Sequence, residues 1–211
     1  MVAPTSVLLY LGFLCLLVCE RGAELLVSRR NARKVLAAGG VETGRRAYVV
    51  MVVVHALFPI ACAAEVLVLK RPFPGAPGLV ALTVALGAQA LRWWAIATLG
   101  WRWNTRVIVV PGAAPVTGGP YRFLRHPNYL AVVLEMLAVP LTHGAWLTAL
   151  VFSALNAALL AVRIPAEGTL LGRPYAEAFE GRSRLIPRGA LWMISGRRES
   201  ETTRSKNYPC G

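Results

Sequence analysis

The chain has 211 residues, of which 56% are hydrophobic and only 16% are charged, and its mean hydropathy is +0.53. This composition excludes an ordinary soluble domain and indicates a membrane protein. The formal net charge of +13 does not indicate nucleic-acid binding, because the basic residues alternate between successive loops instead of forming one patch with interleaved aromatic residues.

The apolar stretches predict the number of membrane crossings. A helix needs roughly 20 apolar residues to cross the hydrocarbon core of a bilayer. The last apolar run, about residues 128–163, is too long for one crossing, so we divide it near the sequence PLTHG at residues 140–144. The predicted fold is an all-α integral membrane protein with about five transmembrane helices, at residues 5–19, 48–69, 77–99, 128–143 and 146–163.

The first apolar stretch has no basic residue before it and no small-residue cleavage site after it, so we expect a retained helix and not a signal peptide. Basic residues gather after the first, third and fifth spans, which predicts an outside amino terminus and cytoplasmic loops at those three places. Only three of the 23 basic residues are lysines, which is typical of a high-GC bacterial genome. We therefore expect the plasma membrane of a bacterium.

The domain organisation is simple. We expect one membrane domain over residues 1–194, followed by a polar, disordered tail over residues 195–211. Residues 31–48 are expected along the cytoplasmic interface, and residues 165–187 as a partly buried cytoplasmic helix and loop.

The polar sequence GPYRFLRHPNYL at residues 119–130 interrupts the apolar chain. A residue before proline is disfavoured in the α region, and proline suits the first position of a helix, so a helix is predicted to begin at Pro127 with His126 just outside it. The positive end of that helix, with Arg122 and Arg125 nearby, would favour an anionic group. Alternatively, the arginines reach lipid headgroups, and Tyr121 and Tyr129 form an interfacial aromatic belt.

A second polar group follows the last span. Arg163 and Glu167 are four residues apart and would share one helical face near the cytoplasmic end of the membrane. They could form a simple surface ion pair. Glu167 could instead accept hydrogen bonds from ribose hydroxyl groups or attract a cationic cofactor.

Ionisable residues within the spans are functional candidates because burying them in a membrane is costly. They are His55, Glu65, Arg92 and Glu135. We expect Glu65 and Arg92 to pair between the second and third helices. Glu135 lies more than one turn beyond Tyr129 in the fourth helix, where it is either a buried anchor or part of a substrate pocket.

Several enzyme classes lack their motifs here. There is no Gly-rich fingerprint between a strand and a helix, so no Rossmann domain is expected. The three histidines are too scattered for a metal site, and the chain has no aspartate for a Ser/His/Asp hydrolase.

The sequence TGGPYRFLRHPNYL, followed by RIPAEGTLLGRPYAEAF and RLIP, resembles the isoprenylcysteine carboxyl methyltransferase family and its bacterial relatives over roughly residues 88–187. The resemblance implies an integral membrane methyltransferase that binds S-adenosylmethionine in a cytoplasmic pocket without a Rossmann fold. Arg163 would lie near the substrate end, and we add Glu135 as a second candidate catalytic residue. Gly168 stands where relatives often have a second acid. The implied cofactor-binding residues are Tyr121, Arg125, His126, Pro127, Asn128, Tyr129 and Glu167.

The predicted reaction is therefore O-methylation of a lipophilic acceptor, without a metal. The acceptor group is a carboxylate or a phenolic hydroxyl, as in an isoprenoid acid or a long-chain phenolic lipid. Two alternatives stay open: an NADPH-dependent membrane reductase of the sterol-reductase group, and a non-catalytic membrane module or small transporter.

Overall fold

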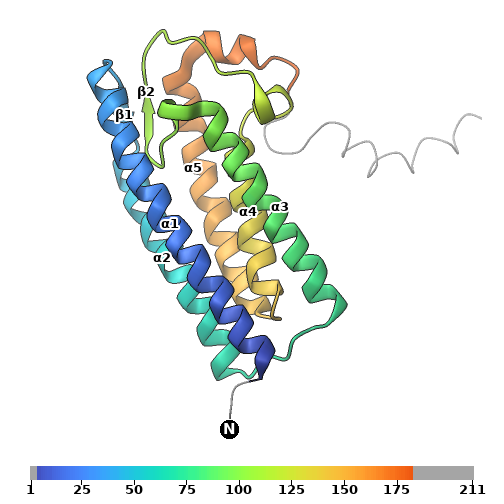
Figure 1. The fold of residues 1–211 in the computed structure, drawn as a ribbon. Helices are drawn as coiled ribbons and strands as arrows, with labels where there is room; N and C mark the ends of the chain where they lie inside the picture. The colour runs from blue at the N-terminus through green and yellow to red at the C-terminus, as the bar shows by residue number, and fades with distance from the viewer. Residues whose placement is uncertain (1–3, 183–211) are drawn as a thin grey trace, which may run out of the picture.

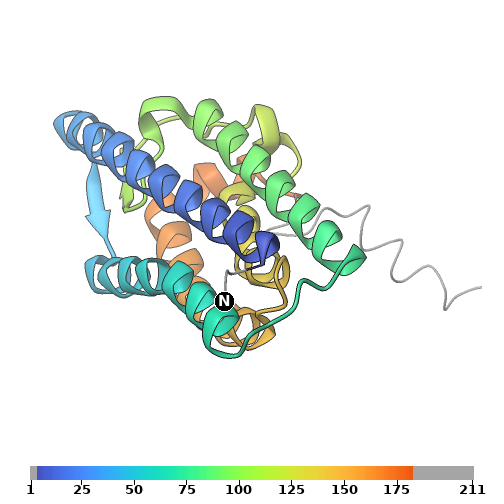
Figure 2. The same ribbon diagram turned by 60° about the horizontal axis from the view of Figure 1, so that its bottom comes forward.

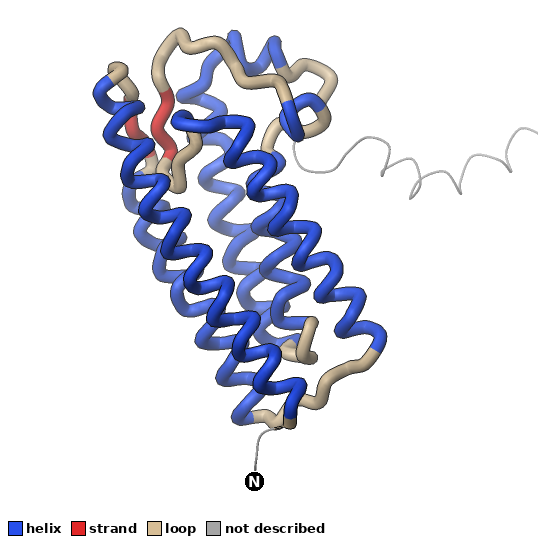
Figure 3. Tube along the Cα trace, in the orientation of Figure 1, coloured by secondary structure: helices blue, strands red, loops and turns tan. Residues whose placement is uncertain are grey.

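The computed structural model describes residues 4–182, and the expected tail at residues 195–211 lies outside the described residues. The described part of the chain is mostly helical, with two short strands at one end (Figures 1 and 3). The long helices are α1 (Thr5–Ala37), α2 (Arg45–Val68), α3 (Ala76–Leu99), α4 (Pro127–Leu141) and α5 (Trp146–Ala178). The shorter elements are the strands β1 (Val41–Thr43) and β2 (Val107–Val109) and the 3₁₀ helices η1 (Gly100–Arg102) and η2 (Gly119–Arg122).

The predicted all-α membrane architecture is confirmed, with one difference in helix length. Four helices, α1, α2, α3 with η1, and α5, are long and apolar enough to cross a membrane. The predicted fourth span corresponds to α4, an apolar helix of only 15 residues. At about 22 Å it is shorter than the roughly 30 Å hydrocarbon core.

The first helix is much longer than the predicted span 5–19, because α1 continues to Ala37. The sequence after Cys19 is rich in charged residues, but it is also rich in Ala, Leu, Glu and Arg, which favour helix. The expected interfacial segment at residues 31–48 is correspondingly the end of α1, strand β1 and the start of α2.

The loops predicted to be cytoplasmic lie together at one end of the molecule. In Figure 1 the amino terminus is at the bottom, whereas both strands, η2 and the end of α5 are at the top. Strand β1 pairs antiparallel with β2, with Val41 opposite Val109 and Thr43 opposite Val107. This pairing joins the α1–α2 connection to the segment between α3 and α4.

The helices pack around a shared interior. Helix α3 packs on α4, α4 on α5, and α5 on α2, while α1 crosses the bundle beside α2 (Figure 2). A cluster of buried apolar side chains that includes Tyr10, Phe58 and Met136 fills the interior. Large apolar residues such as Leu9 and Leu150 are exposed on the outer faces. An outer surface of this kind suits contact with lipid in a multi-pass membrane protein.

The expected pairing of Glu65 with Arg92 is wrong. The Glu65 carboxylate accepts hydrogen bonds from the backbone N–H groups of Leu147 (3.2 Å) and Thr148 (2.7 Å) and pairs with Arg71 at 3.0 Å. It therefore caps the amino terminus of α5, where a helix presents unpaired N–H groups and a positive dipole end. Glu65 is a structural anchor between α2 and α5.

Candidate active site

A cavity of about 480 Å³ lies between the helices and reaches the end that carries the two strands. His126 and Tyr129 line its polar end, and apolar side chains such as Leu14, Phe58 and Val139 line it deeper in the bundle. Helices α1 to α5 and the segment from η1 to β2 all contribute to its wall. The polar motif at residues 119–130 and the apolar interior are thus parts of one space.

The helix entrance has the predicted geometry. His126 has φ −131° and ψ 63° immediately before α4, and Pro127 is the first helical residue. The His126 ring stacks on Tyr129 at a centroid distance of 5.3 Å. The Tyr129 hydroxyl donates a 2.6 Å hydrogen bond to Glu167, and His126 Nδ1 lies 3.8 Å from the same carboxylate oxygen. The motif at the start of α4 and the acid on α5 therefore meet, although 38 residues separate Tyr129 from Glu167.

The end of the described chain covers this entrance. The Tyr175 hydroxyl donates to the Arg125 carbonyl at 3.0 Å, and Arg125 Nε donates to the Arg182 carbonyl at 3.0 Å. Arg182 in turn donates to the Tyr121 carbonyl at 2.8 Å. Burial raises the pKa of the Tyr121 phenol, and the Glu167 carboxylate raises it further, so this phenol stays protonated. The expected partly buried helix at residues 165–187 is found as far as the structure describes it, to residue 182.

Gly172 allows this cover to form. It has φ 68° and ψ −166° inside α5, a backbone conformation that is essentially restricted to glycine. Helix α5 consequently breaks at Gly172, and its last turns can leave the axis of the membrane-spanning part. Phe179, which follows, is fully buried and packs with Tyr121 and Ala95.

Arg163 is buried and does not form the surface ion pair that its spacing to Glu167 also allowed. Its Nη2 donates to the Thr105 carbonyl at 2.8 Å, and its Nη1 contacts the Met51 sulfur. Its guanidinium lies 5.8 Å from the centroid of the Tyr129 ring. Arg163 and Glu167 therefore each contact Tyr129, one through the ring and the other through the hydroxyl.

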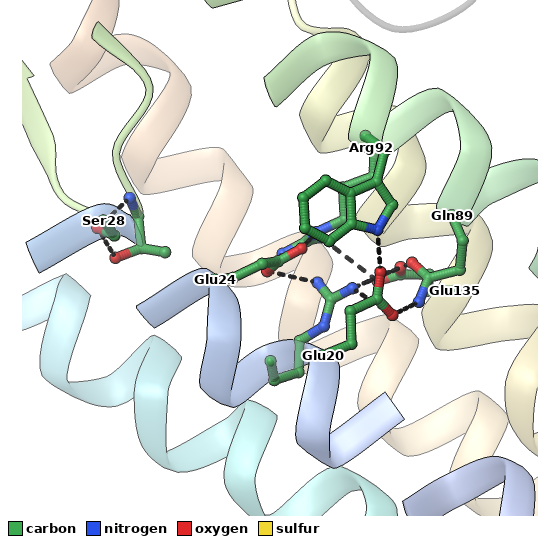
Figure 4. Close-up of polar contacts among 9 residues, drawn as sticks. Glu20, Glu24, Ser28, Gln89, Arg92 and Glu135 are labelled. Carbon is green, nitrogen blue, oxygen red and sulfur yellow. Dashed lines mark hydrogen bonds and ion pairs between the residues drawn. The ribbon is translucent and has the colours of Figure 1, made fainter. Parts of the chain in front are cut away.

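A cluster of charged groups lies deeper, where α1 faces α3 and α4 (Figure 4). Arg92 binds Glu24 through two hydrogen bonds, of 2.6 Å from Nε and 2.8 Å from Nη2. Glu135 is held more loosely, at 3.4 Å from both Arg92 and Arg21. Arg21 also pairs with Glu24 at 2.9 Å. We call this group, completed by Glu20, the acid–arginine cluster.

Glu20 completes the acid–arginine cluster by accepting hydrogen bonds from the side chains of Gln89 and Trp93. The cluster then holds three carboxylates, Glu20, Glu24 and Glu135, and two guanidinium groups. When all five groups are ionised, one carboxylate is in excess. Arg21, Glu24, Arg92 and Glu135 line the cavity, so this charge borders the space that a substrate would occupy.

Four polar atoms of cavity-lining residues have neither a hydrogen-bond nor an ion-pair partner in the described part of the chain. They are Trp103 Nε1, Asn104 Nδ2, Asn128 Oδ1 and Arg163 Nε, and all are buried. Buried polar groups are nearly always paired, so such atoms are suited to meet a polar ligand. A ligand with both donor and acceptor groups fits this part of the cavity.

The structure brings most of the predicted site residues together. Pro127 begins α4, and Glu167 is joined to the site through Tyr129. The predicted residues that line the cavity are Tyr121, Arg125, His126, Asn128, Tyr129, Glu135 and Arg163.

Glu20, Arg21 and Glu24 were not predicted as site residues from the sequence. The predicted first span ended at Cys19, so these residues were treated as the start of a loop. The four-residue spacing of Glu20 and Glu24 was the available signal, because it places both acids on one face if the helix continues. Their partners on α3 and α4 could not be inferred from spacing.

Comparison with known proteins gives the family. Residues 80–173 match the sequence model of the isoprenylcysteine carboxyl methyltransferase family. An uncharacterized Bacillus subtilis protein, YpbQ, is 41% identical over 158 residues, which cover 75% of this chain and 94% of that protein. An uncharacterized Haemophilus influenzae protein is 25% identical over 167 residues, or 79% of this chain and 96% of that protein.

The family match covers most of α3, all of α4 and α5 as far as Arg173, and so includes the helix entrance, Arg163 and Glu167. Membership supports a membrane methyltransferase in general terms. The chain therefore belongs to the isoprenylcysteine carboxyl methyltransferase family.

Proposed function

We propose that the protein uses S-adenosylmethionine to O-methylate a lipophilic acceptor whose reacting group is a carboxylate or a phenolic hydroxyl. The observation that carries the proposal is the single cavity that joins the polar entrance of α4 to an apolar interior. A reaction between a polar cofactor and an apolar acceptor needs both environments in contact. The family membership supports the methyl-transfer chemistry.

The residues at the polar end fit this cofactor. The positive end of α4, with Arg125 beside it, suits the carboxylate of S-adenosylmethionine. Glu167, close to His126 and Tyr129, suits the ribose hydroxyl groups or the positive sulfonium. The unpaired Asn128 Oδ1 could accept a hydrogen bond from an amino group. When bound, the cofactor supplies a methyl group on a positively charged sulfur.

The chain itself would contribute orientation and exclusion of water. The acceptor's apolar part would lie among Leu14, Phe58 and Val139, with its reacting oxygen toward Arg163. Arg163 would stabilise negative charge on that oxygen. Glu135 would line the deeper side of the acceptor pocket. Holding two reactants in a dry, oriented site can supply much of the catalysis of such a displacement.

The proposed membrane topology follows from the charge distribution. We infer a bacterial plasma membrane, an outside amino terminus and a cytoplasmic cofactor site. The basic residues at the end of α1, at the start of α2 and after α3 support this orientation, because these segments lie at the same end as the start of α4. A polar cofactor would then enter from the cytoplasm and an apolar acceptor from the bilayer.

Calorimetric titration of the detergent-purified protein tests the proposal. We expect S-adenosylmethionine and S-adenosylhomocysteine to bind and NADPH not to bind. Binding of NADPH alone would indicate the reductase alternative. Binding of none of the three would contradict the proposal and favour a non-catalytic module or transporter.

A further inference from the structure

His55 lies on α2 and lines the cavity, outside the residues that match the family. Its Nδ1 is 2.8 Å from the carbonyl oxygen of Met51, one turn earlier in the helix. A carbonyl oxygen can only accept a hydrogen bond, so Nδ1 must carry the proton. The neutral ring then has its lone pair on Nε2, which has no hydrogen-bond partner among residues 4–182. His55 therefore presents a proton acceptor at the cavity.

The helical spacing gives the depth of His55. Met51 and Thr105 both contact Arg163, and Ser28 hydrogen-bonds to Thr105 at 2.8 Å. Met51, Ser28 and Arg163 thus lie at similar depth. His55 is four residues beyond Met51, which is about 6 Å along the helix axis.

Glu24 reaches the same depth from the other side of the cavity. It lies four residues before Ser28, on a helix that runs opposite to α2, and is therefore also one turn deeper (Figure 4). Through Arg92 it is joined to Glu135. His55 and the acid–arginine cluster consequently occupy two walls of the cavity at one level.

Charged groups of both signs surround this level. On α1, α3 and α4 they are the members of the acid–arginine cluster, whose carboxylates outnumber its guanidinium groups by one. The carboxylates would attract a positive imidazolium on α2, whereas Arg21, Arg92 and Arg163 would repel it. Arg163 on α5, one turn above, would stabilise a negative acceptor oxygen.

We propose that His55 is the proton acceptor for an acceptor molecule that carries a neutral hydroxyl group. The inference rests on the proposed function and selects hydroxyl over carboxylate acceptors. The acceptor's O–H bond breaks, and its proton moves to His55 Nε2. The acceptor oxygen then forms a bond to the methyl carbon as the carbon–sulfur bond breaks. The positive charge lost from the sulfur remains in the site as the imidazolium.

A binding experiment tests the proton transfer without turnover. A long-chain nitrophenol, whose phenolate is coloured, is added to the protein with S-adenosylhomocysteine at a pH below the phenol's own pKa. In the wild-type protein we expect phenolate absorbance on binding. His55→Gln should still bind the phenol but show at least a fivefold smaller phenolate signal. An equal signal in both proteins would overturn the inference.

His143→Gln is the matched control, because His143 is a buried histidine that packs on Tyr10 and does not line the cavity. It should give the wild-type phenolate signal. Thermal melting of both variants in detergent checks folding, and His55→Asn supplies a second substitution if His55→Gln melts early.

The dependence of rate on phenol acidity gives a second test. A general base contributes about 10² to 10⁴ in rate. We expect His55→Gln to lose about 100-fold with a weakly acidic long-chain phenol and less than tenfold with an acidic nitrophenol, which ionises unaided. Equal losses with both phenols would contradict a role in proton transfer.

The two proposals fail differently. If the wild-type protein methylates long-chain carboxylic acids but not phenols, this inference is wrong and the proposed function stands. If the wild-type protein neither binds S-adenosylmethionine nor methylates any acceptor, the proposed function is wrong and this inference falls with it.

Discussion

The two parts of the bundle are built differently around one cavity. Helices α3, α4 and α5 contain the family match and carry the His126, Tyr129 and Glu167 arrangement, and α4 packs on both α3 and α5. Helices α1 and α2 lie outside the match and supply Glu24, Arg21 and His55 to the opposite wall. Under the proposed function, the first part would hold the cofactor, and both parts would border the acceptor, through Arg163 and Glu135 on one side and His55 on the other.

The attachment of α1 also differs from that of the other helices. Polar side chains bridge it to α3, α4 and the η1 region, with apolar packing around them. Tyr10 donates to the Val139 carbonyl at 3.2 Å, and Asn31 donates to the Trp103 carbonyl at 2.9 Å. Between these two bridges lies the bidentate Glu24–Arg92 pair. Long side chains across a gap leave room for the cavity, which close helix packing would fill.

The largest effect is expected from breaking the central bridge. Arg92→Met leaves the fully buried Glu24 with only Arg21, and loss of one partner of a buried pair costs about 3 kcal/mol or more. We expect a clear fall in the melting temperature in detergent. The double variant Glu24→Gln/Arg92→Met should recover most of it, and the exposed Arg173→Met should have little effect. A stable Arg92→Met protein would show that the pair does not hold α1 in place.

The cofactor side is tested by His126→Ala and Glu167→Ala. Hydrogen bonds to charged groups contribute about 1.5–3 kcal/mol, so we expect at least tenfold weaker binding of S-adenosylmethionine by calorimetry. Membrane insertion and melting should change little. Glu177→Ala, an exposed acid on the same helix as Glu167, is the control. Wild-type affinity in both site variants would remove the assignment of the cofactor site.

The acceptor side is tested by Glu135→Gln, which keeps the shape and removes the charge. Both ion pairs of Glu135 are long, at 3.4 Å, so its contribution to stability should be small. We expect turnover to fall at least tenfold while cofactor affinity and melting temperature stay close to wild type. If expression is lost instead, Glu135 is a structural anchor and is not assigned to the acceptor side of the cavity.

The smallest effect is expected at the strand pair. Glu42 on β1 pairs with Arg106 beside β2, and both side chains are partly exposed. Exposed ion pairs contribute at most about 1 kcal/mol, so Glu42→Gln should lower the melting temperature by no more than about 4 °C. A much larger shift would mean that this pair holds the two parts of the molecule together.

Much of the fold followed from local sequence properties. Apolar length predicted helices α2, α3 and α5, and the His126–Pro127 pair predicted the start of α4. The charged second half of α1 was missed because charge normally ends a span, whereas here Arg21 and Glu24 are paired inside the bundle.

The long-range contacts were harder to predict. Arg92 was expected to pair with Glu65, but a spacing pattern cannot tell which of several buried acids will face an arginine. The meeting of Tyr129 and Glu167 depends on how α4 packs against α5. Turn and helix geometry therefore predicted the motif at the start of α4. The residues that contact this motif are determined by how the helices pack in the assembled bundle.

The length of α1 has a consequence for the kinetics of the reaction. Glu24 lies 19 residues after Thr5, about 29 Å along the helix, close to the thickness of the hydrocarbon core. If α1 enters the hydrocarbon core at Thr5, the acid–arginine cluster lies near the opposite lipid headgroups, where burying charge costs less than at mid-membrane. Under the proposed function, a membrane-dissolved acceptor would hold its polar head at this depth and need not enter water. Its rate of methylation should then follow its mole fraction in the lipid phase, and dilution with inert lipid should slow the enzyme at constant bulk concentration.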